Sequence, residues 1–525
     1  MVPVKLLQTL AASAALASPA LAQCQLDKLL ADDGERLGVF GKSIAVRGDR
    51  ALFGADQTDS GGRDRGAAYV FERAGSTWVQ AARLAASDAE DDDRFGGNVE
   101  LGEDVAFVGC TAKDGYRGAV YAFEPAGTSW IETQKLTAGD AQPAYNFGGE
   151  LACEGDTLVI GCQGHDGPGD TAGSAYVFQR GPSGWVQRQQ LFASDAAADG
   201  NFGSGVALEG NTLLVGALWA AGAAAGAGGV YVFERPGGVG LWTETGRFFA
   251  DDGALGDLFG ADVELSGDTA IANAPVGDAA YVFERSGSTW NQAAKLSIGD
   301  VSGYFGWSAH LAGDLVAVGY PDFEGERPIE GAVYFWKRDA SGWTPRGRVG
   351  ADDAYTGWGL GRFVVIEGSE VFASAPGADE FLNPKGAVYV FSSVFAETTT
   401  YCTSAPSSVG PGARIGFAGS TSVAAGDLVL SVSGAVPGQS SLFYYGGAAL
   451  ELPFGDGFRC VGAGESGIAR LFPVQTVEAD GSAMRAFASG AALSTLYFQF
   501  WYRDPLGPGG AGFNLSDGLC VGFCP

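Results

Sequence analysis

The chain has few of the residues that usually hold catalytic metals or transfer protons at neutral pH. Its 525 residues include only two histidines, His165 and His310, and eight scattered cysteines. Structural zinc sites need four closely spaced Cys or His ligands, so the sequence predicts no metal site and indicates no cofactor. No G-x-S-x-G motif is present, and no cysteine has an evident histidine partner. We therefore expect no enzymatic activity.

Basic residues are also scarce. The chain has 32 Lys and Arg against 61 Asp and Glu, which gives a formal net charge of −29. Such a surface repels nucleic acids and anionic membranes, so neither is an expected partner. After the N-terminus there is no long apolar run, because residues 216–229 are mostly Ala and Gly around Trp219 and are too short to span a bilayer. We therefore expect no membrane insertion.

The first 22 residues have the pattern of a secretory signal peptide. Lys5 precedes an apolar stretch over residues 6–16, and a small-residue cleavage motif ends at Ala22. We expect cleavage after Ala22 and a mature protein that is secreted or held at the cell surface. Cysteines can form disulfides in that oxidising compartment.

Glycine, by contrast, is abundant, with 84 residues and no collagen period. Many turns between short apolar runs are typical of an all-β protein. The dipeptide Phe-Gly also recurs at intervals of 46 to 57 residues, with Trp358-Gly359 as the seventh member. The other six begin at Phe40, Phe95, Phe147, Phe202, Phe259 and Phe305.

Each copy continues with the same parts. A short strand is followed by a turn such as Glu154-Gly155-Asp156, then by a second strand, a variable loop and a third strand. A fourth strand begins near a tryptophan and has an apolar residue six positions later, as in Trp78 and Leu84. Because six is even, we expect both side chains on one buried face. The third strand is marked by Tyr69, Tyr121, Tyr176, Tyr231, Tyr281, Tyr334 and Tyr389.

Seven repeated four-stranded units favour a seven-bladed β-propeller over residues 23–394. The seventh copy lacks a tryptophan strand, whereas Leu29 precedes Phe40 by the same eleven residues that separate Leu84 from Phe95. We therefore expect the N-terminal strand to form the outer strand of the last blade, beside Tyr389. That exchange would close the ring and remove an open sheet edge.

The Phe-Gly pairs, the Tyr-Val-Phe strands, "SAPG" at residues 374–377 and "NAPVG" at residues 273–277 resemble the FG-GAP repeat family, the bacterial relatives of the integrin α-chain propeller. The resemblance covers roughly residues 25–394. It implies a propeller with a binding or adhesive role. The calcium loops of integrin-type members lie between the first and second strands, where this chain has only a short turn that cannot surround a cation.

Acidic residues gather just before the Phe-Gly pairs. We interpret them as a solvated acidic rim, and weak calcium binding by these loops stays open as the alternative. They are Asp32, Asp33, Asp88, Glu90, Asp91, Asp92, Asp93, Asp251, Asp252, Asp257, Asp352 and Asp353.

The tripeptide Arg47-Gly48-Asp49 is an adhesion motif in other proteins. Here it occupies the turn that other copies fill with sequences such as Ser266-Gly267-Asp268. Glycine supplies the positive φ of such a turn and Asp can bond to the local backbone, so we expect a hairpin turn instead of a displayed ligand.

The loops between the second and third strands vary in length and chemistry, and we expect them on one face of the ring with the loops that precede the Phe-Gly pairs. Exposed aromatic and arginine side chains are frequent contact residues for a protein or carbohydrate ligand. The candidate binding residues are Arg63, Arg65, Tyr116, Arg117, Trp219 and Phe323.

The last quarter departs from the repeats. Residues 395–401 have the composition of a linker, and residues 402–525 predict a small β-sandwich. Four cysteines could form two disulfides in it, and three pairings are compatible with the sequence. They are Cys402, Cys460, Cys520 and Cys524. Cys110, Cys153 and Cys162 lie in propeller strands, where we expect buried thiols.

Three hypotheses for the function follow. The first is an exported, non-enzymatic binding or adhesion protein that uses the variable-loop face. The second is a structural component of the cell envelope or matrix, held by the C-terminal module. The third is a glycan-active hydrolase, although a sialidase Asp box is matched only at its end by residues 284–290, where Arg285 replaces the aspartate.

Overall fold

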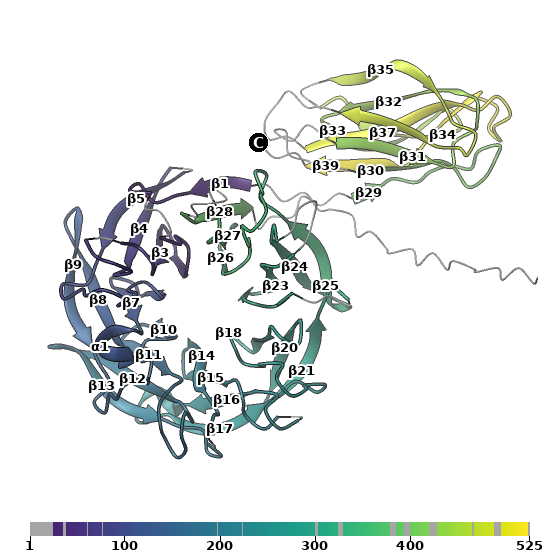
Figure 1. Cartoon of the computed structure of the whole chain (residues 1–525). Helices are drawn as coiled ribbons and strands as arrows, with labels where there is room; N and C mark the ends of the chain where they lie inside the picture. Colours follow the sequence, from purple (N-terminus) through teal and green to yellow (C-terminus); the bar gives the residue numbers. More distant parts are fainter. Residues whose placement is uncertain are drawn as a thin grey trace, which may run out of the picture. The chain divides into compact units, whose positions relative to one another are not determined.

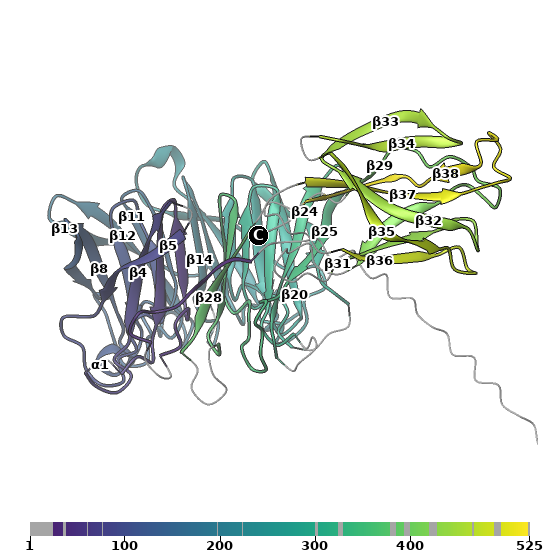
Figure 2. The ribbon, with the colours of Figure 1, turned by 90° about the horizontal axis from the view of Figure 1, so that it is seen from above.

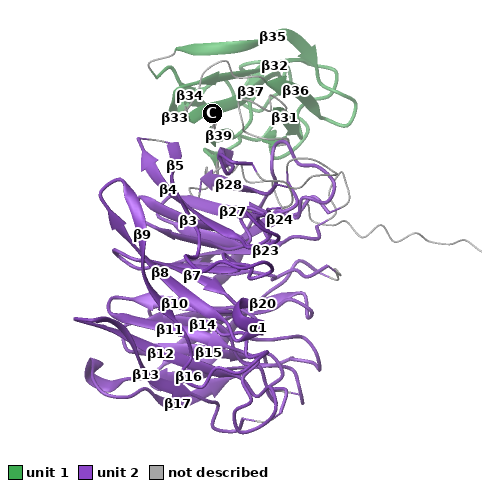
Figure 3. Cartoon of the chain, turned by 60° about the vertical axis from the view of Figure 1, so that its left-hand side comes forward, with its two compact units in different colours: residues 1–22, 396–524 green, residues 23–395, 525 purple. Residues whose placement is uncertain are grey.

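The computed structural model describes residues 25–34, 38–59, 61–75, 77–196, 198–222, 224–299, 303–323, 329–378, 385–392, 399–418, 428–464, 467–487 and 495–522. The expected signal peptide lies outside these residues. Two compact units make up the chain, one over residues 23–395 and the other over residues 396–524 (Figure 3).

The described residues of the first unit form seven four-stranded antiparallel sheets, and Figure 1 shows them arranged as a ring. The first sheet contains β2 (Ile44–Arg47), β3 (Arg50–Ala55), β4 (Ala67–Ala74) and β5 (Thr77–Leu84). The second contains β6 (Asn98–Leu101), β7 (Ala106–Cys110), β8 (Ala119–Ala126) and β9 (Ser129–Leu136). The third contains β10 (Leu151–Glu154), β11 (Thr157–Cys162), β12 (Ser174–Gly181) and β13 (Gly184–Leu191).

The remaining sheets repeat this order. The fourth contains β14 (Phe202–Glu209), β15 (Thr212–Ala217), β16 (Gly229–Glu234) and β17 (Thr243–Phe248). The fifth contains β18 (Val263–Ser266), β19 (Thr269–Ala274), β20 (Ala279–Ser286) and β21 (Thr289–Leu296). The sixth contains β22 (Ala309–Ala312), β23 (Leu315–Tyr320), β24 (Ala332–Asp339) and β25 (Gly342–Val349). The seventh contains β26 (Val364–Glu367), β27 (Glu370–Ala375), β28 (Ala387–Ser392) and β1 (Gln25–Leu29).

Strand β1 is the outermost strand of the seventh sheet. It pairs antiparallel with β28, so that Lys28 lies opposite Tyr389 and Leu29 opposite Val388. Leu29 is buried in an apolar cluster with Phe40 of the first repeat and Phe372 of the seventh. The two ends of the repeat array therefore share one core, as each other pair of neighbouring sheets does.

The phenylalanine of each Phe-Gly pair is buried between sheets. In four of the pairs a bridge joins it to the glycine that precedes the third strand of the preceding sheet, as Phe95 to Gly66. In the seventh repeat Leu360 forms this bridge, with Gly331, and is fully buried. Trp358-Gly359 was therefore the wrong seventh member. Leu360-Gly361 fills the position, because Leu360 forms the bridge and a Cβ on Gly361 would lie 2.5 Å from the carbonyl oxygen of Ala332, whereas Gly359 has no such close neighbour.

The expected burial of the fourth strands is also corrected. Each of the six fourth strands that follow a third strand has a register irregularity; in β5, Ala82 pairs with Val70 but Gln80 pairs with Phe71. The extra residue reverses the alternation of side chains. Trp78 therefore packs toward the seventh sheet, whereas Leu84 packs toward the second.

Helical structure is limited to two short segments, α1 (Lys113–Tyr116) and η1 (Pro236–Gly238), within the described residues. Asp114 and Gly115 have positive φ angles, so α1 is a tight turn in the loop between β7 and β8. Figure 2 shows it at one end of the propeller. The predicted all-β class is confirmed.

The second unit is built from two main sheets. One contains β29 (Thr399–Tyr401), β39 (Gly518–Gly522), β37 (Thr495–Arg503), β32 (Ser440–Gly446) and β35 (Ile468–Thr476), with β38 (Phe513–Leu515) beside β37. The other contains β30 (Arg414–Ala418), β31 (Leu428–Ser433) and β36 (Ala483–Phe487), and a hairpin joins β33 (Ala448–Phe454) to β34 (Gly457–Gly462). One core cluster contains side chains of both main sheets, as expected of a sandwich. Residues 399–401, expected as linker, form β29 instead.

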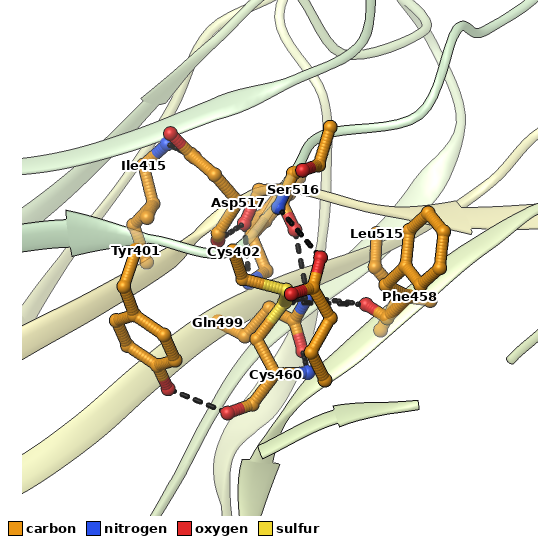
Figure 4. Close-up of a disulfide and its surroundings, with 12 residues drawn as sticks. Tyr401, Cys402, Ile415, Phe458, Cys460, Gln499, Leu515, Ser516 and Asp517 are labelled. Carbon is orange, nitrogen blue, oxygen red and sulfur yellow. Dashed lines mark hydrogen bonds between the residues drawn. A yellow bond between two sulfur atoms is a disulfide. The ribbon is translucent and has the colours of Figure 1, made fainter. Parts of the chain in front are cut away.

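A disulfide between Cys402 and Cys460 lies in this second unit (Figure 4). Beside it, the Tyr401 hydroxyl donates to the Cys460 carbonyl oxygen and the Cys460 N–H donates to the side chain of Gln499. Cys524 lies outside the described residues, so the pairing expected of the other two cysteines stays a prediction. In the propeller, Cys110, Cys153 and Cys162 are buried free thiols, as predicted.

Candidate functional site

The variable loops lie together at one end of the propeller. The loop between β3 and β4 contacts the loop between β5 and β6, where the N–H of Asp92 donates to the carbonyl oxygen of Arg63. In the second repeat the N–H of Asn146 donates to the carbonyl oxygen of Tyr116. The expected grouping of these two classes of loop is therefore confirmed.

The six candidate binding residues do not form one site. Arg63 and Arg65 lie in the first repeat, Tyr116 and Arg117 in the second, Trp219 in the fourth and Phe323 in the sixth. A ring of sheets spaces these loops around its circumference. A single ligand could contact the neighbouring loops of the first and second repeats, but the other two positions are separated from them by intervening sheets.

The two arginines of the first repeat bind acidic residues of this chain. The guanidinium of Arg63 forms a bidentate ion pair with Asp92, and Arg65 Nε donates to Asp91 at 3.0 Å. The Arg63 side chain is 70% exposed. Its Nε and Nη2 groups, however, already donate to the carboxylate of Asp92. Much of the positive charge expected on this face is therefore neutralised locally.

The aromatic candidates differ in exposure. Tyr116 is 50% exposed and Trp219 is 42% exposed. Phe323, expected to be exposed, instead packs between Tyr320 and Tyr334, with the Arg348 guanidinium 4.3 Å from its ring centre. The loop folds back onto its own sheet because burying the ring removes apolar surface from water. Phe323 is thus part of the local core and no exposed contact residue.

The Arg47-Gly48-Asp49 turn is the predicted hairpin, with Arg47 paired to Arg50 and Gly48 at a φ of 59°. The Arg47 side chain points inward across the ring. Its guanidinium donates to the carbonyl oxygens of Leu101 at 2.9 Å and Cys153 at 3.2 Å. A receptor cannot engage this arginine while it bridges the second and third sheets.

The acidic residues before the Phe-Gly pairs are not simply solvated, which corrects our interpretation of them as a rim. In six repeats an aspartate before the Phe-Gly pair accepts a hydrogen bond from the buried third-strand tyrosine, as Asp88 does from Tyr121 at 2.6 Å, and two of these aspartates, Asp140 and Asp195, were not among the residues we named from the sequence. The other pairs are Tyr69 with Asp33, Tyr176 with Asp140, Tyr231 with Asp195, Tyr281 with Asp252, and Tyr389 with Asp353.

These contacts control ionisation. Burial opposes the charge of Asp88, but hydrogen bonds from Lys135 and Tyr121 outweigh it and lower the pKa of Asp88. The same balance, with Lys295 and Tyr281 as donors, lowers the pKa of Asp252. Within the described ranges no group of three or more His, Cys, Asp or Glu side chains is placed to hold a metal ion. These acids therefore serve as anchors for the outer strands.

A cavity of about 510 Å³ lies among the innermost strands, and a second of about 250 Å³ shares several of its lining residues. Four carboxylates line the larger cavity, namely Glu100, Glu150, Asp262 and Glu264. Our sequence interpretation missed them. The available signal was acidic residues three and five positions after the phenylalanine of the Phe-Gly pair, where the first copy has Ser43 and Ala45.

Burial dominates the ionisation of these four groups. It raises the pKa of Glu100 to about 7 despite Arg47, and raises the pKa of Asp262 to about 7. Burial, reinforced by Asp262, raises the pKa of both Glu150 and Glu264 well above the usual 4.5. The centre of the propeller thus concentrates carboxyl groups that resist losing their protons.

Comparisons with known proteins agree with the motifs. The FG-GAP repeat family matches residues 24–71, 78–123, 130–178, 185–233 and 242–288. Integrin alpha-11 of Mus musculus is 31% identical over 148 residues, which cover 24% of this chain and 12% of that protein. The chain therefore spans about an eighth of the length of this relative.

Solved structures give weaker similarities. Sqt1 of Saccharomyces cerevisiae has a TM-score of 0.41 at 9% identity, with 96% of this chain and all of that one covered. A putative 6-phosphogluconolactonase of Bacteroides fragilis has a TM-score of 0.43 at 11% identity, covering 60% of this chain and 85% of that one. These scores are too low to carry an argument. The five segments between residues 24 and 288 that match the family model are FG-GAP repeats.

Proposed function

We propose that this protein is an exported, non-enzymatic binding protein that uses its variable-loop face to hold a protein or glycan ligand at the cell surface. The observation that carries the proposal is the exposure of Tyr116 and Trp219 on loops of that face. The hairpin turns at the opposite end of the propeller are short, by contrast, and pack against their own sheets. Exposed aromatic side chains are the commonest anchors of binding interfaces. The FG-GAP repeats and the likeness to part of an integrin α-chain support the same role.

Trp219 is the strongest single candidate. It lies in a loop of small residues between β15 and β16, and Leu255, which is 74% exposed, lies across Gly226 from it. Together Trp219 and Leu255 form a small apolar patch that water covers poorly. A partner that buried this patch would gain free energy in proportion to its area.

Binding of the full mature chain to a glycan array and to cell-surface proteins tests the proposal. We expect Trp219→Ala to weaken binding by about 1–2 kcal/mol, roughly tenfold. Val239→Ala is the matched control, because Val239 is 76% exposed but lies outside the variable-loop face. It lies in the connection between the third and fourth strands of its sheet, β16 and β17, at the opposite end of the propeller. Unchanged binding by the tryptophan variant, or equal loss in both variants, would contradict the loop face as the site.

A structural role is the second candidate, because residues 396–524 form a compact unit with its own apolar core. Cell fractionation with and without residues 402–525 distinguishes the two roles. A structural component held by this unit would be released to the medium when it is removed, whereas unchanged retention would dismiss anchoring.

A further inference from the structure

The central cavity has an unbalanced distribution of charge. Glu100 lies near Arg47, and Lys42 acts on Glu150, so both carboxylates on that side have a cation nearby. Asp262 directly precedes β18 and Glu264 lies on it. Neither carboxylate forms an ion pair with any described residue. Glu264 instead experiences the negative charges of Asp262, Glu100 and Glu150. The carboxylates of Asp262 and Glu264, on one side of the cavity, are therefore not neutralised by a nearby cation of the described chain.

Hydrogen bonding to the same side is incomplete. The Asp262 carboxylate accepts from Asn273 Nδ2 at 3.2 Å and from the N–H of Ala309 at 3.4 Å, but the Glu264 carboxylate accepts no hydrogen bond from any residue in the described ranges. Nor can His310 on β22 supply a charge at neutral pH, because burial lowers its pKa to about 4. Glu264 is half-buried, so its carboxylate has lost part of its hydration without gaining a donor, and a ligand that supplies one would be stabilised there.

A second unsatisfied group lines this cavity. Ser308 is only 4% exposed, and its Oγ has no partner in the described part of the chain. The corresponding hydroxyl of Ser43 donates, at 3.1 Å, to the carbonyl oxygen of a glycine in the next sheet, and Ser204, one position earlier in its own repeat, donates at the same distance to the equivalent glycine. Ser308 thus differs from these serines because its hydroxyl makes no such bond, and its Oγ can accept a hydrogen bond from a bound donor.

Aromatic side chains stand beside these polar groups. Tyr304, which is 45% exposed, and Trp307 line the cavity with their ring centres 5.6 Å apart. The guanidinium of Arg362 lies 3.5 Å from the Trp307 ring centre, so this surface already holds one organic cation of the chain itself. Stacking of a cation on an indole is favourable, and more so in a desolvated position.

We propose that the cavity beside β18 and β22 binds a small aliphatic diamine or polyamine. The ammonium groups would donate to the carboxylates of Asp262 and Glu264 and to Ser308 Oγ, while the methylene chain would lie on Trp307 and the apolar strand residues. A volume of about 510 Å³ falls in the usual range for a small-molecule site. The inference does not depend on the loop-face ligand.

A metal ion fits the same residues less well. In the part of the chain that the structure describes, no three His, Cys, Asp or Glu side chains lie close enough together to hold a metal ion. Hard cations need about six oxygen ligands around a single point. A linear amine distributes its charges along its length and can satisfy carboxylates that lie at separate positions on the strands.

Isothermal titration of the full mature chain with putrescine and spermidine at about pH 8 tests the proposal. We expect saturable binding of one amine per chain, and at least ~10-fold weaker binding by Glu264→Gln and by Asp262→Asn, since each removes a charge-assisted hydrogen bond. Asp156→Asn is the matched control, because it removes one negative charge from an exposed turn between β10 and β11. Ser308→Ala, which leaves the charge unchanged, should also weaken binding.

Several outcomes would overturn the assignment. These are absence of saturable amine binding, equal loss in the Asp156 control, and displacement of the amine by an equal concentration of calcium. Tight binding of a lysine-rich peptide without binding of putrescine would overturn the small-molecule ligand. Thermal melting separates folding from binding, because Glu264→Gln removes repulsion and should fold at least as stably as the parent.

Discussion

The glycine of each Phe-Gly pair occupies a position that admits no side chain. Gly96 has a φ of 95°, and a Cβ built on it would overlap the carbonyl oxygen of Ala67. The corresponding Gly203 has a φ of 92° and the same overlap with Ser174. Both the backbone conformation and the close approach of the third strand of the preceding sheet therefore require glycine.

Gly96→Ala should destabilise the propeller by about 2–4 kcal/mol, because it combines a strained φ with a steric overlap that the backbone must relieve. Gly97→Ala is the neighbouring control, since the nearest atom to its Cβ would be the Arg94 carbonyl oxygen at 3.6 Å. We expect the control to change stability by less than about 1 kcal/mol. Urea unfolding measures both, and similar losses in the two variants would refute the steric account.

The carboxylates of the central cavity make stability depend on pH. The folded-state pKa is raised to about 7 for Glu100 and Asp262, and well above 4.5 for Glu264. A group with a raised pKa binds its proton more tightly in the folded state, so its contribution is complete below the unfolded pKa and is lost as pH rises through the folded pKa.

We therefore expect the thermal midpoint to fall as pH rises from about 4.5 to about 7 and beyond. Glu264→Gln should flatten this decline, because glutamine stays neutral at every pH in the range. Asp156→Asn, outside the cavity, should leave the profile unchanged. A midpoint that rises between these pH values would show that other groups dominate.

At the scale of the element, the outer strand of each sheet stabilises the fold through two kinds of contact. Their irregular register lets one strand bury Trp78 toward one neighbouring sheet and Leu84 toward the other. Their basic residues also lie opposite the third-strand tyrosines, as Lys135 lies opposite Tyr121, and bind the acidic residue that precedes the Phe-Gly pair of the same repeat, as Lys135 binds Asp88. Strand β1 follows the same scheme, with Lys28 bound to Asp353 at 2.8 Å.

Leu29→Ala should destabilise the propeller by about 2–4 kcal/mol, because Leu29 is 3% exposed and its loss leaves a cavity where the last sheet meets the first. Leu26→Ala is the control on the same strand, since Leu26 is 46% exposed. That variant should change stability by no more than about 0.5 kcal/mol. Equal effects in chemical unfolding would mean that β1 contributes no specific burial.

At the scale of the whole molecule, the two compact units have separate cores. The clusters of the propeller contain residues of the first unit only, and the sandwich cluster contains only residues between Ala413 and Val521. The disulfide between Cys402 and Cys460 joins residues 58 positions apart within the second unit. We therefore expect each unit to respond separately to changes within it.

Replacing Cys402 and Cys460 together by serine should destabilise the second unit by about 2–4 kcal/mol, because the unfolded chain gains conformational freedom. Differential scanning calorimetry should show one transition at lower temperature and the propeller transition in place. A shift of both transitions by the same amount would contradict separate unfolding.

The sequence by itself determined the features that arise within one repeat. The strands, the glycine turns, the buried tyrosines and the pairing of β1 with Tyr389 follow from alternation, turn chemistry and a constant offset, which act over short stretches of chain. The same local rules failed for Trp78, because one inserted residue reverses the alternation without a signal in composition.

Only the tertiary structure decided what meets at the centre and on the loop face. Glu100, Glu150 and Glu264 come from three different sheets and share a cavity because the ring places their first strands side by side. Arg47 turns inward for the same reason, and Phe323 is withdrawn from the surface by its own sheet. The physical reason is that apolar burial and the attraction or repulsion of charges act between residues that are far apart in the chain. The interacting residues belong to different repeats, so the sequence of a single repeat does not reveal them.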